Sequence, residues 1–243
     1  MITGNSKLRK YTTIYPKSIY TINSLEDYTQ YGFKLLKQSN NKKLGKVVKK
    51  GIYKKKPLYS LSLVEREMGC PKHCLHWQDC YGNNMPFAHR FKTDNDMIFC
   101  NILNTEVFNL LKKHKQGIHI RLHVLGDFFS SYYINWWLAL LTCYENVSVY
   151  GYTAHTKHSV LGSKIENTIR KIGFNRFAVR YSNSNVKLSA NSVEFSKNKV
   201  VPINENARLK AIPCPEQINK VENCSSCALC WNKNVNQISF KTH

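Results

Sequence analysis

One stretch in the middle of this 243-residue chain constrains its fold more than any other feature. Between Ile118 and Val124 apolar and polar residues alternate, which predicts a strand because successive side chains of a strand point to opposite faces. Apolar residues then recur at helical spacing from Ile134 to Leu141, so an amphipathic helix is expected to follow. The same order continues as a strand over 147–153, a helix over 160–172 and a strand over 176–181.

This order of strand, helix, strand, helix, strand with short connections predicts a βαβαβ unit, whose strands are parallel. Upstream, we expect a strand over 59–64 and a helix over 105–115. A short strand over 200–203 would lie at a sheet edge, because Pro202 lacks the N–H that a central strand needs. The expected fold class is α/β, with a mostly parallel sheet of βα repeats that resembles a partial barrel and a C-terminal cysteine-rich module.

The chain carries a net charge of +21, from 36 Lys and Arg against 15 Asp and Glu. Much of the excess lies in residues 1–60, which hold 14 basic and 2 acidic residues interleaved with tyrosines. Cations that displace counterions and rings that stack on bases are typical of nucleic-acid surfaces. A solvated lysine-rich surface that reflects codon usage accounts for the same composition, so both interpretations stay open. We expect a basic segment over 1–57, an α/β core over 58–203 and a four-cysteine module over 204–243.

The sequence lacks the features of membrane and secreted proteins. Its longest apolar run, Ile134–Cys143, is far shorter than the roughly 20 residues of a membrane span. The first ten residues do not include the apolar stretch of a secretory signal. With 42% hydrophobic residues the chain can bury a core, so disorder is not expected either. We therefore expect a cytoplasmic protein, in which nine cysteines indicate metal or redox chemistry rather than disulfides.

The strongest local motif is a C-terminal run of three cysteines, with a fourth ten positions before it. The four are Cys214, Cys224, Cys227 and Cys230. Thiolates spaced as C-x2-C-x2-C can face one inorganic centre, as they do in ferredoxin-type iron–sulfur proteins. Zinc also accepts four thiolates, but usually from two C-x2-C pairs separated by a longer spacer. We expect a metal here and favour an iron–sulfur cluster, with zinc as the alternative.

A second cysteine group, Cys70, Cys74 and Cys80, lies in the loop after the first predicted strand. Three thiolates leave the fourth coordination position of a metal centre open, and an open iron could hold a cofactor. A closed site would instead be a structural zinc site. The candidates for a fourth ligand are Cys100, His73 and His76. Cys143, at the end of an apolar helix, is expected in the core.

In parallel α/β folds, ligands bind beyond the carboxyl ends of the strands. Those ends should bring the first cysteine loop close to Gly126 and Asp127 and to polar residues that end the next two strands. These are Tyr152, Thr153, Arg180 and Ser182. Asp127 or Ser130 could instead cap the helix that follows.

Alternation along the strand that begins at Ile118 also predicts that three polar side chains share one face, namely His119, Arg121 and His123. If this face lines the interior of a barrel, the three belong to the site. If it lies under a covering segment, they are satisfied polar residues of the core.

Several motifs occur together in a fixed order along the chain. They are Gly4-Asn5-Ser6-Lys7-Leu8, Cys70-Pro with Cys74 and Cys80-Tyr81, Arg121-Leu-His123 with Gly126-Asp127-Phe128, Tyr150-Gly-Tyr152-Thr153, and Cys214-Pro with Cys224, Cys227 and Cys230-Trp231. In this combination the chain resembles the phage-borne family named for gene product eighty-eight. The resemblance covers most of the chain outside residues 10–57 and implies a protein of the host cell cytoplasm, but no particular activity.

More distantly, the layout is similar to that of radical S-adenosylmethionine enzymes, which carry three cysteines after the first strand and a Gly-Gly-Glu-like motif after the second. The resemblance implies that the first cysteine group holds an open four-iron cluster and that the last four cysteines hold an auxiliary one. It also implies that Gly126 and Asp127 bind the amino group of S-adenosylmethionine. The spacing here is C-x3-C-x5-C where that family has C-x3-C-x2-C, and Gly-Asp stands in place of Gly-Gly-Glu.

Two functional hypotheses follow. The first is an iron–sulfur enzyme of radical S-adenosylmethionine type that acts on nucleic acid or on a protein associated with it. The second is a non-enzymatic protein in which iron–sulfur or zinc centres hold together a nucleic-acid-binding surface, with a host or phage protein as a further partner. In the first hypothesis the candidate catalytic residues are Arg121, His123, Asp127 and Tyr152, and the candidate cofactor-binding residues are Gly126, Asp127, Thr153, Arg180 and Ser182.

Overall fold

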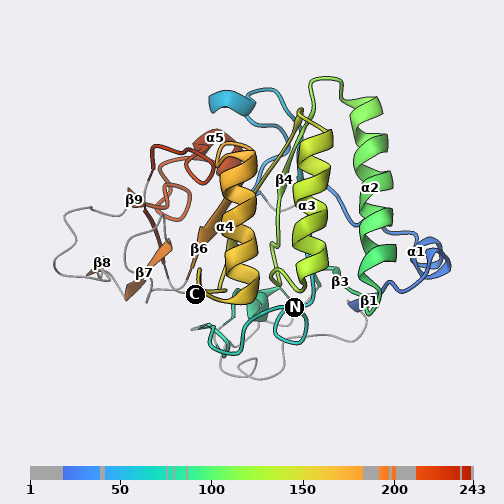
Figure 1. Ribbon diagram of the computed structural model, residues 1–243. Helices are drawn as coiled ribbons and strands as arrows, with labels where there is room; N and C mark the ends of the chain where they lie inside the picture. The colour runs from blue at the N-terminus through green and yellow to red at the C-terminus, as the bar shows by residue number, and fades with distance from the viewer. Residues whose placement is uncertain are drawn as a thin grey trace.

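The α/β fold class expected from the sequence is confirmed (Figure 1). The computed structural model describes residues 19–38, 42–74, 76–78, 80–85, 87–182, 192–196, 199–200, 212–235 and 237–241. Its central sheet has four parallel strands in the order β2-β4-β5-β6. These strands are β2 (Leu58–Ser60), β4 (Ile118–Arg121), β5 (Val147–Thr153) and β6 (Phe177–Tyr181).

Three helices cover one face of this sheet and lie side by side in Figure 1. They are α2 (Asp96–Lys113), α3 (Ser131–Cys143) and α4 (Val160–Ile172). The main core lies between the helices and the sheet, where alternate strand residues such as Ile120, Val149 and Val179 pack against Trp137 and Ile165. The helices therefore bury only every second side chain of each strand.

The predicted elements differ from the observed ones mainly at their ends. The strand over 147–153 and the helix over 160–172 have the predicted bounds. Helix α2 begins nine residues before the predicted position 105, because Asn95 caps it by accepting a hydrogen bond from the Ile98 N–H. Strand β4 ends at Arg121 rather than at 124, because the backbone turns into the left-handed region at His123. Of the short strand expected over 200–203, only Val200 is described, in β8 (Lys199–Val200), and 201–203 lie outside the described residues.

The opposite face of the sheet is covered by residues from both ends of the chain. Leu44, Val48 and Tyr53 pack there with Trp231. The imidazole of His119 stacks between the ring of Tyr53 (4.7 Å between centroids) and that of Tyr150 (5.0 Å). The boundary expected at residue 57 thus does not coincide with a break in packing.

Smaller elements complete the described part of the chain. The strand β1 (Ile19–Thr21) pairs in parallel with β3 (Arg90–Lys92), and α1 (Leu25–Tyr31) follows β1. Two short 3-10 helices, η2 (Gly51–Tyr53) and η3 (Tyr81–Asn84), lie in loops. The C-terminal part contains α5 (Cys224–Cys227) and a second four-stranded sheet of β8, β7 (Ser192–Ser196), β10 (Ile238–Lys241) and β9 (Ile212–Pro213). None of the described helices combines the length and apolarity that a membrane crossing needs.

A buried carboxylate fastens residues 19–38 to the helical layer. Glu106 of α2 accepts hydrogen bonds from the backbone N–H groups of Leu35 (2.8 Å) and Leu36 (2.7 Å) and from the hydroxyl of Tyr28 (2.5 Å). Burial raises the pKa of this carboxyl group, and the three hydrogen bonds oppose that shift. Glu106 therefore adds a polar attachment of this segment to the pairing of β1 with β3 and the packing of Leu35 and Leu36 in the main core.

Replacing this carboxylate tests the attachment. We expect Glu106→Ala to lower the free energy of unfolding by about 3 kcal/mol, because two buried N–H groups lose their acceptor. Urea unfolding would measure the change, with Glu145→Ala at an exposed carboxylate of the same domain as the control. Equal midpoints for the two variants would contradict this role of Glu106.

Candidate metal centres

Most candidate site residues fall into two groups, one on the face of the central sheet away from the helices and one at its carboxyl edge. Arg121, Tyr152 and Arg180 point away from the helices and toward the C-terminal module. Tyr150 and Ala178, which lie two positions along the same strands and so share this face, pack under that module. Asp127, Thr153 and Ser182 lie instead at the carboxyl edge of the sheet. Strand-end position predicted Tyr152 and Arg180 at the carboxyl edge beside Asp127, but their side chains contact the C-terminal module instead.

The carboxyl edge carries the first cysteine group. In Figure 1 the teal segment that contains it lies beyond the sheet, near the beginning of α3. Two glycines with positive φ allow this approach: a Cβ on Gly126 would lie 2.7 Å from the Cβ of Leu63, and one on Gly69 would lie 2.6 Å from the Cα of Phe129. Gly126 thus serves close packing of two loops, which is a role that needs no cofactor.

Asp127 connects two of the loops at this edge. Its buried carboxylate accepts hydrogen bonds from the backbone N–H groups of Ala154 (2.7 Å) and Phe128 (2.7 Å). Burial raises the pKa of Asp127, and the hydrogen bonds and His155 oppose that shift. The α3 cap is Ser130, which accepts from the Tyr133 N–H, so Asp127 is not the cap of that helix.

The neighbouring loop is fixed by polar contacts around Thr153. Its carbonyl accepts hydrogen bonds from the N–H (2.8 Å) and the hydroxyl (3.0 Å) of Ser182, and its hydroxyl accepts from the His155 N–H (3.1 Å). The imidazole of His155 donates from Nε2 to the carbonyl of Phe128 (2.9 Å), since a carbonyl can only accept. Three loops are thereby joined at the carboxyl edge.

The charges of Asp127, Cys80 and Cys74 act on the thiol of Cys70, so these groups share one part of the carboxyl edge. Burial raises the pKa of Cys70 most, and the nearby Asp127, Cys80 and Cys74 raise it further. The Arg66 N–H bonds to the sulfur of Cys70, and the Gly82 N–H donates to the sulfur of Cys80 at 3.4 Å. Such N–H donors stabilise sulfur that carries negative charge, as a metal-bound thiolate does.

An ion-pair network holds this loop in place. Arg90 and Glu65, both buried, form a two-pronged salt bridge at 2.7 and 3.0 Å. Arg66 donates to the carbonyl of Trp77 and to the side chain of Asn83, both at 2.6 Å. Burying two charges costs desolvation free energy, which their attraction offsets only when the geometry is good. Other loop conformations would lose this geometry, so the network favours one conformation of the loop.

His123 does not share a face with His119 and Arg121, contrary to the prediction. Strand β4 ends at Arg121, and the φ of 48° at His123 turns its ring toward α3, where Nε2 hydrogen bonds to the hydroxyl of Tyr133 (3.0 Å). Burial, with Arg121 and His155 nearby, lowers the pKa of His123 to about 3. The imidazole is therefore neutral at physiological pH.

The other predicted ligands and cysteines have different environments. Cys100 is buried in the helical core, where burial raises its pKa to about 12. His73 is exposed and His76 is partly buried. Cys143 is exposed at the end of α3, so its expected place in the core is wrong.

The four C-terminal cysteines lie near one another on the face of the sheet that the helices do not cover. Burial raises the pKa values of Cys214, Cys224 and Cys227, the last to about 11, and in each case the nearby sulfur of Cys230 raises it further. Backbone N–H groups of Glu216 and Gln217 bond to the sulfur of Cys214, and that of Leu229 to Cys227. Lys43, Lys50 and Arg121 are the cations that act on these thiols.

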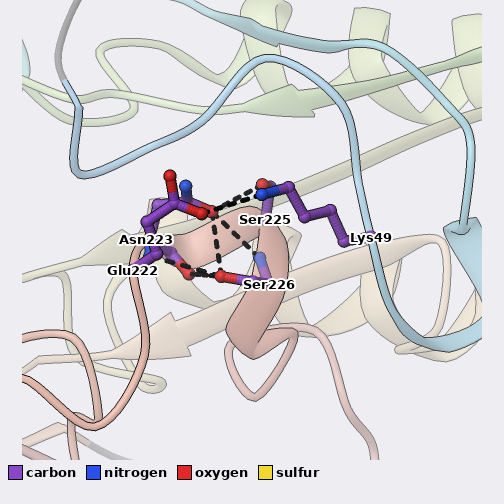
Figure 2. A network of polar contacts seen from close by, with 5 residues as sticks. All are labelled: Lys49, Glu222, Asn223, Ser225 and Ser226. Carbon is purple, nitrogen blue, oxygen red and sulfur yellow. Dashed lines mark hydrogen bonds and ion pairs between the residues drawn. The ribbon is translucent and has the colours of Figure 1, made fainter.

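The short helix α5, which presents two of these cysteines, is held by residues 43–49. The N–H groups of Cys224 and Ser225 donate to the carbonyls of Lys43 (2.7 Å) and Leu44 (3.1 Å). Figure 2 shows the polar network beside them: Asn223 caps α5 through Ser225 and Ser226, and Lys49 pairs with Glu222 at 2.8 Å. Lysines of the basic segment therefore belong to the structure around the C-terminal cysteines.

Two residues assigned to a cofactor or to catalysis contact this module instead. The fully buried guanidinium of Arg180 donates to the carbonyls of Cys230, Val235, Asn232 and Leu229, at 2.8, 2.8, 3.0 and 3.3 Å. The hydroxyl of Tyr152 donates to the sulfur of Cys230 at 3.0 Å. The sequence offered no signal for these contacts, because they join residues some 50 to 78 positions apart.

All nine cysteines lie within the described residues, and all are free thiols. Within the described ranges, no three His, Cys, Asp or Glu side chains form a group that could hold a metal ion as they stand. The donor chemistry nevertheless suits a metal centre in both places, because each contains several partly buried cysteines with N–H or O–H donors directed at sulfur.

The Arg180 contacts predict a local effect of substitution. Arg180→Lys keeps the charge but loses the planar fork, so we expect proteolytic cleavage within 212–241 to become about tenfold faster, as a loss of about 1.4 kcal/mol in local stability would produce. Arg176→Lys is the matched control, because Arg176 also donates to backbone carbonyls, those of Leu141 and Tyr144. Mass spectrometry of the fragments would locate the cuts, and equal cleavage of 212–241 in both variants would refute the role of Arg180.

Comparison of the chain with models of protein families, with curated proteins and with solved structures finds no match to any of them. What the protein does must therefore be inferred from the two cysteine groups and their surroundings.

Proposed function

We propose that this chain is an iron–sulfur protein and that it acts as an enzyme of radical S-adenosylmethionine type on nucleic acid or on a protein associated with it. The observation that carries the proposal is the position of the first cysteine group. Its thiols lie at the carboxyl edge of a parallel sheet, where α/β enzymes bind ligands, and next to the buried carboxylate of Asp127.

In this proposal Cys70, Cys74 and Cys80 would hold an iron–sulfur cluster. When bound, such a cluster supplies an electron that splits the sulfonium of S-adenosylmethionine. Asp127 would hold the amino group of that cofactor, because its carboxylate is fixed by two backbone N–H groups and keeps further acceptor capacity. Buried His155 holds the Asp127 loop against the following strand end.

The four C-terminal cysteines hold the auxiliary cluster. Arg180 fixes the loop that follows Cys230, and residues 43–49 fix the helix that carries Cys224 and Cys227. Zinc in this position is the alternative metal, since it accepts the same four thiolates.

Metal analysis after anaerobic purification tests the proposal. We expect both iron and acid-labile sulfide, with Cys70→Ser/Cys74→Ser and Cys224→Ser/Cys227→Ser each removing part of the iron. We further expect S-adenosylmethionine to change the electron-spin spectrum of the reduced protein, and the change to be lost in the first double variant and retained in the second.

Each alternative gives a different outcome in the same experiment. Zinc without sulfide would refute the iron–sulfur assignment. Iron and sulfide with a spectrum that S-adenosylmethionine leaves unchanged would refute the enzyme and leave a metal-stabilised binding protein.

A basic surface next to the C-terminal module favours that second function. Its exposed lysines are Lys42, Lys46, Lys49, Lys50, Lys54 and Lys55. Between Asp27 and Glu65 the sequence contains no acidic residue, so these cations are not offset within their own segment. A surface of this kind binds phosphate backbones by releasing counterions.

Charge removal distinguishes a binding surface from solvated lysines. We expect the triple variant Lys46→Gln/Lys50→Gln/Lys54→Gln to weaken nucleic-acid binding and to reduce the slope of log K against log salt by about 1 for each lysine that contacts a phosphate. The control removes three exposed lysines near the end of α2, Lys112, Lys113 and Lys115. Fluorescence anisotropy at several salt concentrations measures both, and equal slopes would exclude the surface.

A further inference from the structure

Polar atoms without partners surround the C-terminal cysteines. Among the described residues, Nη1 of Arg121 and the hydroxyl of Tyr150 are buried and have no hydrogen-bond partner. A buried donor without an acceptor costs about 1–3 kcal/mol, and more when it is charged. Two such donors side by side indicate that an acceptor belongs between them and the cysteines.

The geometry places both donors at the four-cysteine group. The guanidinium of Arg121 lies 5.3 Å from the ring centre of Tyr150 and 4.8 Å from that of Tyr152, whose hydroxyl already donates to the sulfur of Cys230. Arg121 acts electrostatically on Cys224. Burial raises the pKa of the Tyr150 hydroxyl well above its usual value, and the charges of Cys224, Cys227 and Cys230 raise it further.

Neighbouring contacts keep these two donors in position. The ring of Tyr150 packs against His119 and, at 4.6 Å between centroids, against Trp231. It is therefore buried in the apolar cluster on the face of the sheet opposite the helices. Arg121 ends β4 and is held over the two tyrosine rings. The hydroxyl of Tyr150 cannot reach solvent without unpacking this core, and Nη1 of Arg121 is buried although the residue as a whole is partly exposed.

We propose that Arg121 and Tyr150 are positioning residues that donate hydrogen bonds to sulfur atoms of an iron–sulfur cluster held by Cys214, Cys224, Cys227 and Cys230. This inference rests on the proposed iron–sulfur function and names what sets the properties of its second centre. Inorganic sulfides and thiolates are the acceptors that the two donors lack. Hydrogen bonds and a cation favour the reduced form of a cluster, because reduction adds one negative charge.

The reduction potential of the C-terminal cluster tests the proposal. The measurement uses full-length protein with Cys70→Ser/Cys74→Ser/Cys80→Ser, so that only the second cluster is observed, and dithionite as the reductant. In this background we expect Arg121→Met to lower the ratio of reduced to oxidised cluster about tenfold at a fixed potential, which corresponds to about 59 mV for one electron. We expect Tyr150→Phe to lower it in the same direction by less, because it removes a neutral donor.

Two further variants separate this role from packing. Tyr53→Phe is the matched control, because Tyr53 is a buried ring on the same face whose hydroxyl donates to the carbonyl of Asn175. It should leave the potential unchanged, and Arg121→Lys should restore part of the shift by returning the charge. Iron lost from Arg121→Met but retained in Tyr53→Phe would support the contact as well.

The contrary outcomes are distinguishable. A cluster whose potential is the same in Arg121→Met, Tyr150→Phe and Tyr53→Phe overturns the role of the two donors and leaves the iron–sulfur assignment intact. Unsubstituted protein whose four C-terminal cysteines hold no iron and sulfide overturns the proposed function and this inference together.

Discussion

The contact between the buried guanidinium of Arg180 and the loop at 229–235 joins the C-terminal four-cysteine module to the central sheet. Arg180 lies in the last strand of the central sheet, and its donors are taken up by backbone carbonyls from Leu229 to Val235. A buried arginine is tolerated only with such partners, and carbonyls in a loop need donors equally. The contact therefore places the four-cysteine module on the face of the sheet that the helices leave uncovered, within reach of Tyr152.

Strand alternation then gives the sheet two different environments. Every second side chain enters the helical core, and the residues between them, Arg121, Tyr150 and Tyr152 among them, meet the cysteine module. The carboxyl edge forms a third environment, in which the Cys70 loop meets Asp127. One small sheet thus supports two cysteine groups, and Arg121 is close enough to act on both Cys224 and His123.

Much of this fold could be predicted from the sequence, because its information is local. The strand at 147–153 and the helix at 160–172 have strong periodicity, and the short connections imply parallel strands. The gathering of Asp127, Thr153 and Ser182 near Cys70 followed from the same rule. The predictions that failed concerned side chains whose position depends on one backbone angle or on a partner far away in the sequence. A left-handed residue at His123 ended the alternation early, and no local pattern indicates that Arg180 serves a loop 50 residues away or that Glu65 pairs with Arg90.

The sequence suggested that the lysine-rich N-terminal segment binds nucleic acid or is simply solvated, whereas in the structure some of its lysines contact the C-terminal module. Lys43 and Lys49 form ion pairs with Glu216 and Glu222 of the C-terminal module. Part of the positive charge therefore helps to hold in place the segment that carries the C-terminal cysteines. The central claim, that these cysteines bind clusters, is tested most directly by X-ray absorption at the iron edge on anaerobically purified protein. The account predicts scattering from sulfur and from a second iron at the short separation of a cluster. Iron surrounded only by oxygen and nitrogen, or zinc in its place, would contradict it.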